Sequence, residues 1–310
     1  MKKIFLMFPG QGSQSIGMGK DFYNKYEASR NIIDKLDDKL KNVIFNGPED
    51  ELKNTKNAQP AIFAVSVAMF EALKSLIDLS KFEIVTAGHS LGEYSALAVS
   101  GCFSFEDGLK IVKARGQFIA EASSINPGLM AAIMGMKKEA VIDICKQASQ
   151  FGVCEAVNFN SPGQIVISGT NNAISKAVEI AKENGALKAV LLNVSGPFHS
   201  SLMKLASEKM KIELEKYNFM KLKYPIITNC DAQITREVSV IKEKSVKQIY
   251  SPVLWDTSIS NAIYSGFDTF IEIGPGRVLT GLMRRIDKNK KAMNIEKIAN
   301  LETVIEELNK

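Results

Sequence analysis

A glycine-flanked serine between an apolar run and a helical pattern constrains the fold of this 310-residue chain more than any other feature. Phe82–Ala87 has strand character, it leads into Gly88-His89-Ser90-Leu91-Gly92, and helical spacing resumes through Leu97. In this G-x-S-x-G pattern the glycines permit a sharp turn that lifts the serine hydroxyl above the edge of a sheet. A glycine-rich turn that merely needs small residues is the alternative, and the strand–turn–helix context favours a nucleophile at Ser90.

Strand and helix patterns alternate along the rest of the chain and indicate an α/β fold with a largely parallel sheet. Two further strands each end in a glycine-rich loop, at Ile4–Phe8 and Phe267–Ile273. A proline at position 60 favours a helix start there. The predicted helices of this part are Gln59–Ile77, which is long and buried, Phe105–Ala122 and Val278–Ile286.

The middle of the chain follows a different order, β-α-β-β-α-β, which is that of a ferredoxin-like unit. The segments are Met130–Met134, Lys138–Ser149, Cys154–Phe159, Gln164–Ser168, Asn172–Asn184 and Ala189–Val194. We therefore predict an inserted subdomain over residues 126–195 and a catalytic body formed by residues 1–125 and 196–310. The cleft between the two is the natural place for a ligand.

A serine nucleophile needs a base, and the chain offers two histidines. His89 adjoins Ser90, and neighbouring residues on a tight turn project in different directions, so we expect His89 to pack the turn. His199 lies in Ser195-Gly196-Pro197-Phe198-His199-Ser200-Ser201, a loop between a subdomain strand and a helix. A surface or helix-capping role is the alternative, and elimination favours His199 as the base.

The order of these residues differs from that of ordinary α/β-hydrolases, in which a carboxylate and then a C-terminal histidine follow the serine. Here the eligible histidine is in mid-chain, and no carboxylate stands out as its partner. Either another group, such as a backbone carbonyl, holds the imidazole, or the chain is not a hydrolase.

Two backbone amides are candidates for stabilising an oxyanion. The residue after the nucleophile normally gives one N–H, which here is that of Leu91. The loop Pro9-Gly10-Gln11-Gly12-Ser13-Gln14 follows the first strand and can approach closely, so the amide of Gln11 is the second candidate. A purely structural turn is the alternative for this loop.

Arg115 lies among apolar residues of the predicted helix Phe105–Ala122. Only six of the chain's 39 basic residues are arginines, so a guanidinium at this position indicates a need for its planar fork. A carboxylate on the substrate would meet that need. A surface salt bridge is the alternative.

Composition excludes several other functions. Two histidines and four cysteines without CxxC spacing make a metal site improbable, and unpaired cysteines fit a cytoplasmic protein. The net charge of +5 is spread along the chain, which fits a solvated surface or steering of an acidic partner, and no nucleic-acid-binding pattern occurs. The longest apolar stretch, Ala61–Phe70, is too short to span a membrane.

These motifs together resemble the malonyl-CoA:acyl carrier protein transacylases and the acyltransferase domains of fatty acid and polyketide synthases. The similarity spans nearly the whole chain, and several motifs in order are more specific than any one. They are Phe8-Pro9-Gly10-Gln11-Gly12-Ser13-Gln14, Gly88-His89-Ser90-Leu91-Gly92-Glu93, Arg115-Gly116, Val157–Gln164, Phe198-His199-Ser200, Tyr250-Ser251-Pro252-Val253 and Glu272-Ile273-Gly274-Pro275-Gly276.

The resemblance implies a hydrolase-like body carrying a ferredoxin-like insert, and an enzyme that moves malonyl from malonyl-CoA to acyl carrier protein without a cofactor. It implies that Arg115 binds the malonyl carboxylate and that the backbone carbonyl of Gln248 orients His199. It also implies that Asn160 lines the cleft and that Phe198 favours malonyl over methylmalonyl. We further expect a cytoplasmic monomer that feeds fatty acid synthesis.

Two rival functions stay open at this point. A thioesterase would use water as the acyl acceptor, and a cationic clamp for the acyl group would then be superfluous. A scaffold that only docks acyl carrier protein would need none of the three residues Ser90, His199 and Arg115.

Overall fold

The computed structural model describes residues 1–310 and contains two sheets. The larger sheet has the strand order β10-β9-β1-β2-β7-β8, and all its strand pairs are parallel except the β7–β8 hairpin. Its strands are β1 (Lys2–Phe8), β2 (Phe82–Gly88), β7 (Ile226–Ile227), β8 (Ile234–Thr235), β9 (Thr269–Ile273) and β10 (Lys291–Ile295). The prediction of a mostly parallel central sheet is confirmed.

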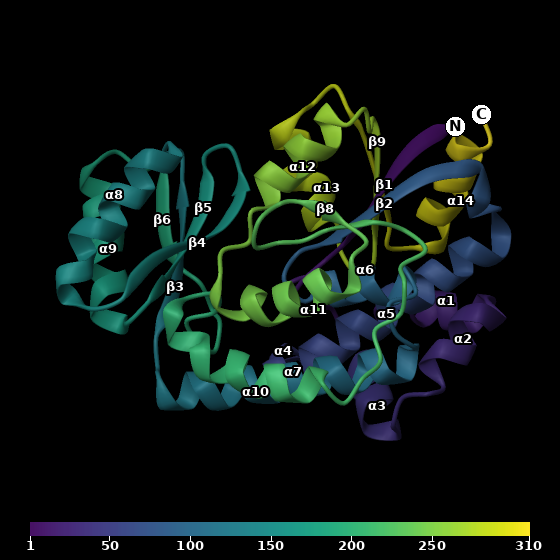
Figure 1. The fold of residues 1–310 in the computed structure, drawn as a ribbon, viewed down its shortest axis with the longest axis horizontal. Helices are drawn as coiled ribbons and strands as arrows, with labels where there is room; N and C mark the ends of the chain where they lie inside the picture. The colour runs from purple at the N-terminus through teal and green to yellow at the C-terminus, as the bar shows by residue number, and fades with distance from the viewer.

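The smaller sheet is antiparallel, with the order β4-β5-β3-β6. Its elements follow one another as β3 (Leu129–Met134), α8 (Lys138–Ala148), β4 (Cys154–Ser161), β5 (Gln164–Gly169), α9 (Asn171–Glu183) and β6 (Lys188–Leu191). The predicted β-α-β-β-α-β order is therefore present. This unit forms one end of the molecule, with α8 and α9 on its outer side, while both chain termini lie in the body (Figure 1).

Side chains alternate between the two faces of the central sheet, and both faces are buried. In β1, Ile4, Leu6 and Phe8 join one core, which includes much of α5 and α7. Phe5 and Met7 join a second core with Trp255 of α12 and Leu279 of α13. Two covered faces explain why the strands are nearly continuous apolar runs rather than alternating ones.

Helices make up the rest of the body. They are α1 (Lys20–Lys25), α2 (Glu27–Ile33), α3 (Asp38–Asn46), α4 (Glu49–Lys53), α5 (Thr55–Leu76), α6 (Gly92–Val99), α7 (Phe105–Ile125), α10 (Lys204–Leu214), α11 (Val238–Lys247), α12 (Trp255–Tyr264), α13 (Val278–Ile286) and α14 (Ile298–Leu308). Single 3-10 turns cover Leu79–Lys81, Ser149–Phe151, Ser201–Met203 and Gln248–Tyr250. None of the helices has the length and apolar content needed to cross a bilayer.

Some predicted boundaries were wrong. Helix α5 begins at Thr55 rather than near Pro60, because the Asn54 side chain accepts a hydrogen bond from the Lys56 amide and caps the helix earlier. Strand β9 begins at Thr269, after a turn at Gly266 that places Phe267 before the strand. Strand β6 ends at Leu191 instead of Val194, and residues 192–194 line a cavity instead of extending the sheet.

The segment Gly88–Gly92, here called the serine turn, is packed so closely against β1 that Gly92 has no room for a side chain. A Cβ built on Gly92 would lie 2.0 Å from the Phe8 carbonyl oxygen. We expect Gly92→Ala to lower the free energy of unfolding by about 3 kcal/mol, because backbone must move to relieve the overlap.

Gly281 of α13 is the matched control, since a Cβ there meets nothing within 4 Å. Gly281→Ala should stabilise the protein by about 0.5–1 kcal/mol through helix propensity. Urea unfolding of both variants measures the difference. Equal stabilities for the two would contradict the packing argument.

Candidate active site

Ser90 sits on a strained turn at the carboxyl end of β2. Its backbone has φ 52°, in the left-handed region that non-glycine residues seldom adopt. The turn then enters α6 at Gly92. This strand–turn–helix geometry raises the Ser90 side chain above the sheet, in agreement with the pattern in the sequence.

The structure brings Ser90 and His199 together although 109 positions separate them. Ser90 Oγ lies 2.7 Å from His199 Nε2, and His199 Nδ1 lies 2.9 Å from the backbone oxygen of Gln248. A carbonyl oxygen can only accept a hydrogen bond, so Nδ1 carries the proton and Nε2 is left to accept from the serine hydroxyl. The arrangement can remove the proton of the serine without a carboxylate.

His199 is also held in its neutral form. Burial, and next the positive charge of Arg115, lower its pKa from 6.5 to about 3. A neutral imidazole is the state that can act as a base, so His199 is ready for proton abstraction over the whole neutral range.

This lowered pKa predicts the pH dependence of the reaction. The rate constant for acylation of Ser90 should change by less than about twofold between about pH 7 and pH 5, because the folded-state pKa lies below that range. The folded chain binds fewer protons at His199 than the unfolded chain does, so stability decreases as the pH falls from 6.5 toward 3. Rapid-quench kinetics measure the acylation rate constant, and a fall in that rate constant centred near pH 6.5 would contradict the prediction.

Arg115 reaches the same point from α7 and is only 2% exposed. Its Nη2 donates to Ser90 Oγ at 3.1 Å and to Gln248 Oε1 at 3.0 Å, and its Nη1 donates to Gln59 Oε1 at 2.7 Å. No carboxylate forms a salt bridge with it, and its Nε has no hydrogen-bond partner. A buried, incompletely paired guanidinium beside a nucleophile is able to bind an anionic substrate group.

Gln248 contacts all three of these residues. Its backbone oxygen accepts from His199, its Oε1 accepts from Arg115, and its Nε2 donates to the Ser90 backbone oxygen at 2.8 Å. The resemblance in the sequence implied only the first contact. The side chain of Gln248 additionally fixes the distance between the guanidinium and the serine turn.

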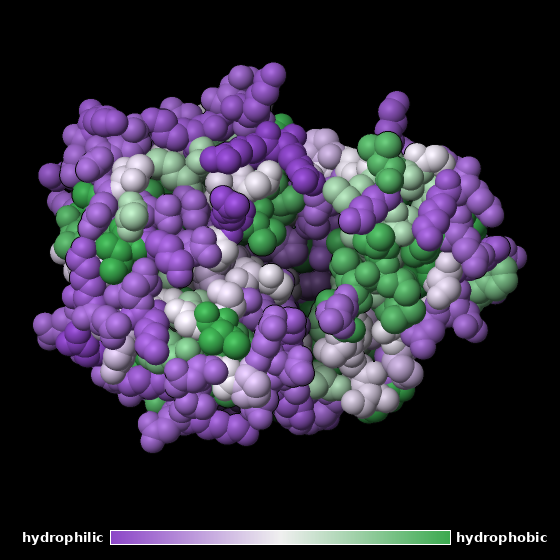
Figure 2. All heavy atoms as spheres, turned by 180° about the vertical axis from the view of Figure 1, so that it is seen from behind, coloured by the Kyte–Doolittle hydropathy of each residue, from purple (hydrophilic) through white to green (hydrophobic).

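A cavity of about 400 Å³ opens beside this cluster. Its walls come from the body and from the insert, and the space-filling view shows a hollow between them, bordered by apolar side chains on the insert side (Figure 2). The lining residues are Gln11, Gly12, Gln14, Lys53, Gln59, His89, Ser90, Leu91, Arg115, Ile119, Met130, Asn158, Leu192, Asn193, Val194, Phe198, His199, Met203 and Ile249.

The two amides considered for an oxyanion are both free. Gln11 and Leu91 line the cavity, and neither backbone N–H donates a hydrogen bond within the protein. The Gln11 side chain is held in place, since its Oε1 accepts from Thr55 Oγ1 at 2.7 Å. Unused amides beside a nucleophile are suited to a developing negative charge on oxygen.

Gln248 and Asn160 are the predicted site residues that do not line the cavity. Asn160 contacts His89 instead. Its Oδ1 lies 2.8 Å from His89 Nε2, and the His89 ring packs against Trp255 at 5.8 Å between centroids. Asn160 therefore contacts the turn through the His89 side chain. Asn158, two residues earlier in β4, lines the cavity instead, and the β4–β5 register shifts between Phe159 and Ser161, on either side of Asn160.

Sequence reasoning missed several polar residues at the site. Gln59 binds Arg115, and it could have been noticed as the polar residue just before the apolar run Ala61–Phe70. Asn229, in the turn after β7, accepts a hydrogen bond from the Ser90 amide at 2.8 Å. Nothing in its surroundings in the sequence identified it, because it reaches the serine only through the tertiary fold.

A serine on a strand–turn–helix elbow, with an imidazole and a buried guanidinium at its hydroxyl, defines an acyl-transferring enzyme. Comparison with known proteins agrees: residues 5–308 match the acyl transferase domain family, and the chain belongs to it.

Individual relatives are more specific. The chain is 44% identical to the malonyl CoA-acyl carrier protein transacylase of Bacillus subtilis, over 99% of this chain and 98% of that protein. The crystal structure of an acyl-carrier-protein-S-malonyltransferase from Bartonella henselae superposes with a TM-score of 0.96 at 40% identity, covering 99% of this chain and all of that one. A malonyl-transacylase in complex with its type II PKS acyl-carrier protein has a TM-score of 0.93 at 36% identity, covering 99% of this chain and all of that one. The resemblance and the fold class predicted from the sequence are confirmed.

Proposed function

We propose that this protein transfers the malonyl group from malonyl-CoA to the phosphopantetheine thiol of acyl carrier protein and so supplies fatty acid synthesis. The observation that carries the proposal is the meeting of Ser90, His199 and Arg115 in the lining of a single cavity. The names of the relatives, and the carrier protein bound to one of them, support the same substrates.

In the first half-reaction, His199 Nε2 takes the proton of Ser90 while Oγ attacks the thioester carbonyl of malonyl-CoA. The oxyanion of the tetrahedral intermediate accepts hydrogen bonds from the amides of Gln11 and Leu91. When the C–S bond breaks, His199 returns the proton to the departing sulfur of CoA, and malonyl remains as an ester on Ser90.

In the second half-reaction, the phosphopantetheine thiol of the carrier protein occupies the place of CoA. His199 takes the thiol proton, sulfur attacks the ester carbonyl, and Ser90 Oγ leaves with the proton from His199. The backbone oxygen of Gln248 stabilises the imidazolium that forms in each half-reaction, in the place of the missing carboxylate.

Arg115 gives the site its preference for malonyl. The malonyl carboxylate would replace the serine hydroxyl as a partner of Nη2 and form a charge-assisted pair inside the cavity. Phe198 lines the cavity beside His199 and is suited to limit branching at the acyl α-carbon. Asn160 supports the turn through His89 rather than touching the acyl group.

We place the enzyme in the cytoplasm as a monomer that needs no cofactor, with a body of residues 1–125 and 196–310 and an insert of residues 126–195. The insert supplies Met130, Asn158 and Leu192 to the cavity, so that movement of the insert relative to the body would change access to Ser90.

Steady-state kinetics with both substrates test this function against its rivals. A covalent malonyl-enzyme predicts parallel lines in double-reciprocal plots and formation of malonyl-carrier at the rate of CoA release. CoA release that is independent of the carrier would indicate a thioesterase. Carrier binding without CoA release would indicate a scaffold, and either result would remove the proposed function.

A further inference from the structure

A side chain outside the catalytic cavity forms hydrogen bonds with the backbone of the serine turn. Asn229 is buried in the turn that connects β7 and β8. Its Oδ1 accepts from the Ser90 amide at 2.8 Å, and its Nδ2 donates to the Gly88 carbonyl oxygen at 2.7 Å. The Asn229 carboxamide therefore accepts from one and donates to the other of the two backbone groups that flank His89.

These bonds hold a conformation that the turn would otherwise leave. A left-handed backbone costs a residue with a side chain about 1–2 kcal/mol, and Ser90 has that backbone. Its carbonyl oxygen is also held, by the Gln248 side chain at 2.8 Å and by the Glu93 amide at 3.1 Å. The direction of the Ser90 hydroxyl depends on this backbone, and only Asn229 contacts it on the amide side.

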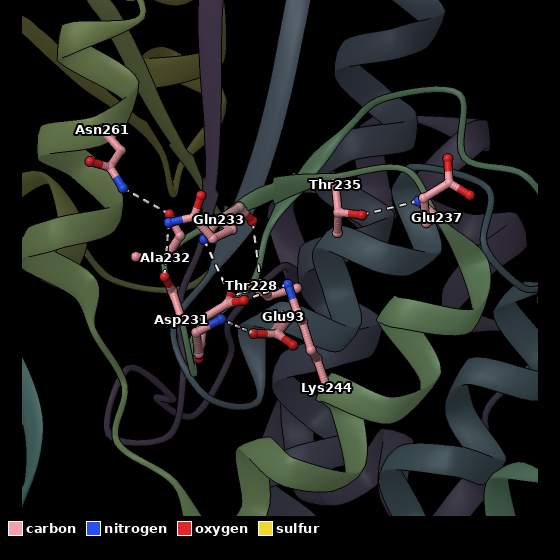
Figure 3. Close-up of polar contacts among 10 residues, drawn as sticks. Glu93, Thr228, Asp231, Ala232, Gln233, Thr235, Glu237, Lys244 and Asn261 are labelled. Atoms are coloured by element: carbon pink, nitrogen blue, oxygen red, sulfur yellow. Dashed lines mark hydrogen bonds and ion pairs between the residues drawn. The ribbon is translucent and has the colours of Figure 1, made fainter.

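Asn229 is itself fixed by groups from other elements. The backbone N–H of Asn229 donates to Glu93 Oε2 at 2.7 Å, and its backbone carbonyl oxygen accepts from the Leu254 amide at 2.9 Å. All four of its polar groups are thus used. Figure 3 shows the Glu93 carboxylate directed at this turn from α6.

The turn that carries Asn229 is braced from a second side. Asp231 accepts from Thr228 Oγ1 at 2.5 Å and pairs with Lys244 Nζ of α11 at 2.5 Å (Figure 3). Asn261 of α12 donates to the Ala232 carbonyl oxygen at 2.9 Å. A side chain presented by so many fixed contacts can impose its geometry on the serine turn.

The contact also determines which amides remain available to the substrate. Because the Ser90 N–H is bonded to Asn229, it cannot stabilise an oxyanion, whereas the Leu91 N–H has no partner in the protein. We infer that Asn229 is a positioning residue of the acyl transfer reaction. It orients the Ser90 hydroxyl toward His199, and it occupies the Ser90 amide, so that the amides of Leu91 and Gln11 bind the oxyanion. This inference rests on the proposed function, in which Ser90 is the nucleophile.

Single-turnover acylation by malonyl-CoA tests the inference in Asn229→Ala, with unfolding curves to select conditions in which the variant is folded. A displaced hydroxyl should lower the acylation rate constant at least about 100-fold and leave the half-saturating malonyl-CoA concentration within about threefold. Thr235→Ala is the matched control, because the Thr235 hydroxyl lies on the same hairpin and only accepts from the Glu237 amide. It should acylate at the wild-type rate.

Asn229→Asp supplies a readout that a merely structural role would not move. The ionised carboxyl can accept from the Ser90 amide but repels the Gly88 oxygen, whereas the protonated carboxyl can donate to it. Burial and the neighbouring Glu93 carboxyl favour protonation of the introduced Asp side chain near neutral pH. The nearby cations oppose it less, because Lys244 is paired with Asp231 and Arg115 binds Gln248. Acylation relative to wild type should therefore rise at least about tenfold from pH 8 to pH 6.

The outcomes separate the two claims. If the wild type acquires no malonyl on Ser90, the proposed function is wrong. If the wild type is acylated, and Asn229→Ala reacts within about threefold of it or Asn229→Asp shows no recovery at pH 6, Asn229 does not position the nucleophile.

Discussion

His199→Ala should slow the acylation of Ser90 by malonyl-CoA at least about 10⁴-fold, because the serine hydroxyl loses the only base within hydrogen-bond distance. The residual rate would come from the oxyanion amides and from substrate binding. Rapid-quench measurement of acyl-enzyme formation gives the rate constant directly.

His89→Gln is the control for this experiment, since His89 is the chain's other histidine and is half-buried in the same turn. Glutamine can keep a donor for Asn160, so this variant should lose less than about tenfold in rate. A comparable loss in both variants would mean that the histidines act by packing the turn rather than by proton transfer.

Arg115→Ala should abolish the preference for malonyl over acetyl thioesters. Removing one partner of a buried charge pair costs about 2–5 kcal/mol, so kcat/KM for malonyl-CoA should fall by between about 30-fold and about 5,000-fold more than that for acetyl-CoA. The ratio of the two substrates is the informative quantity, because Arg115 also contacts Ser90 and Gln248 and its loss lowers both rates.

Arg115→Lys separates charge from shape at this position. Lysine keeps the positive charge, but its single nitrogen cannot occupy the positions of both Nη1 and Nη2, so the variant should retain only part of the malonyl preference. Equal use of malonyl-CoA and acetyl-CoA by the unaltered protein would contradict the role given to Arg115.

Local patterns predicted the parts of the fold that local chemistry determines. Ser90 lies at the junction of a strand and a helix, and the insert alternates strands and amphipathic helices, so both follow from side-chain spacing alone. The start of α5 was missed because the Asn54 cap competes with the helix-start preference of Pro60. The two-residue strands β7 and β8 leave almost no periodic pattern to detect.

The candidate site was predictable to the extent that each residue had a chemical reason to stand out. His199 could be inferred because the chain has only two histidines, and Arg115 because an arginine is rare in this chain. Gln59, Asn158 and Asn229 are ordinary polar residues, and only the packing of distant segments brings them to Ser90 or its cavity. Asn160 was placed in the cleft by resemblance, whereas in the structure it binds His89 and does not line the cavity.

Mass spectrometry after brief exposure to malonyl-CoA tests the central claim most directly. We expect a mass increase of one malonyl group on the tryptic peptide Phe82–Lys110, located at Ser90, labile to alkali and lost when holo acyl carrier protein is added. The Ser90→Ala variant should acquire no label. A label that persists in that variant, or that lies on any other residue, would contradict the account.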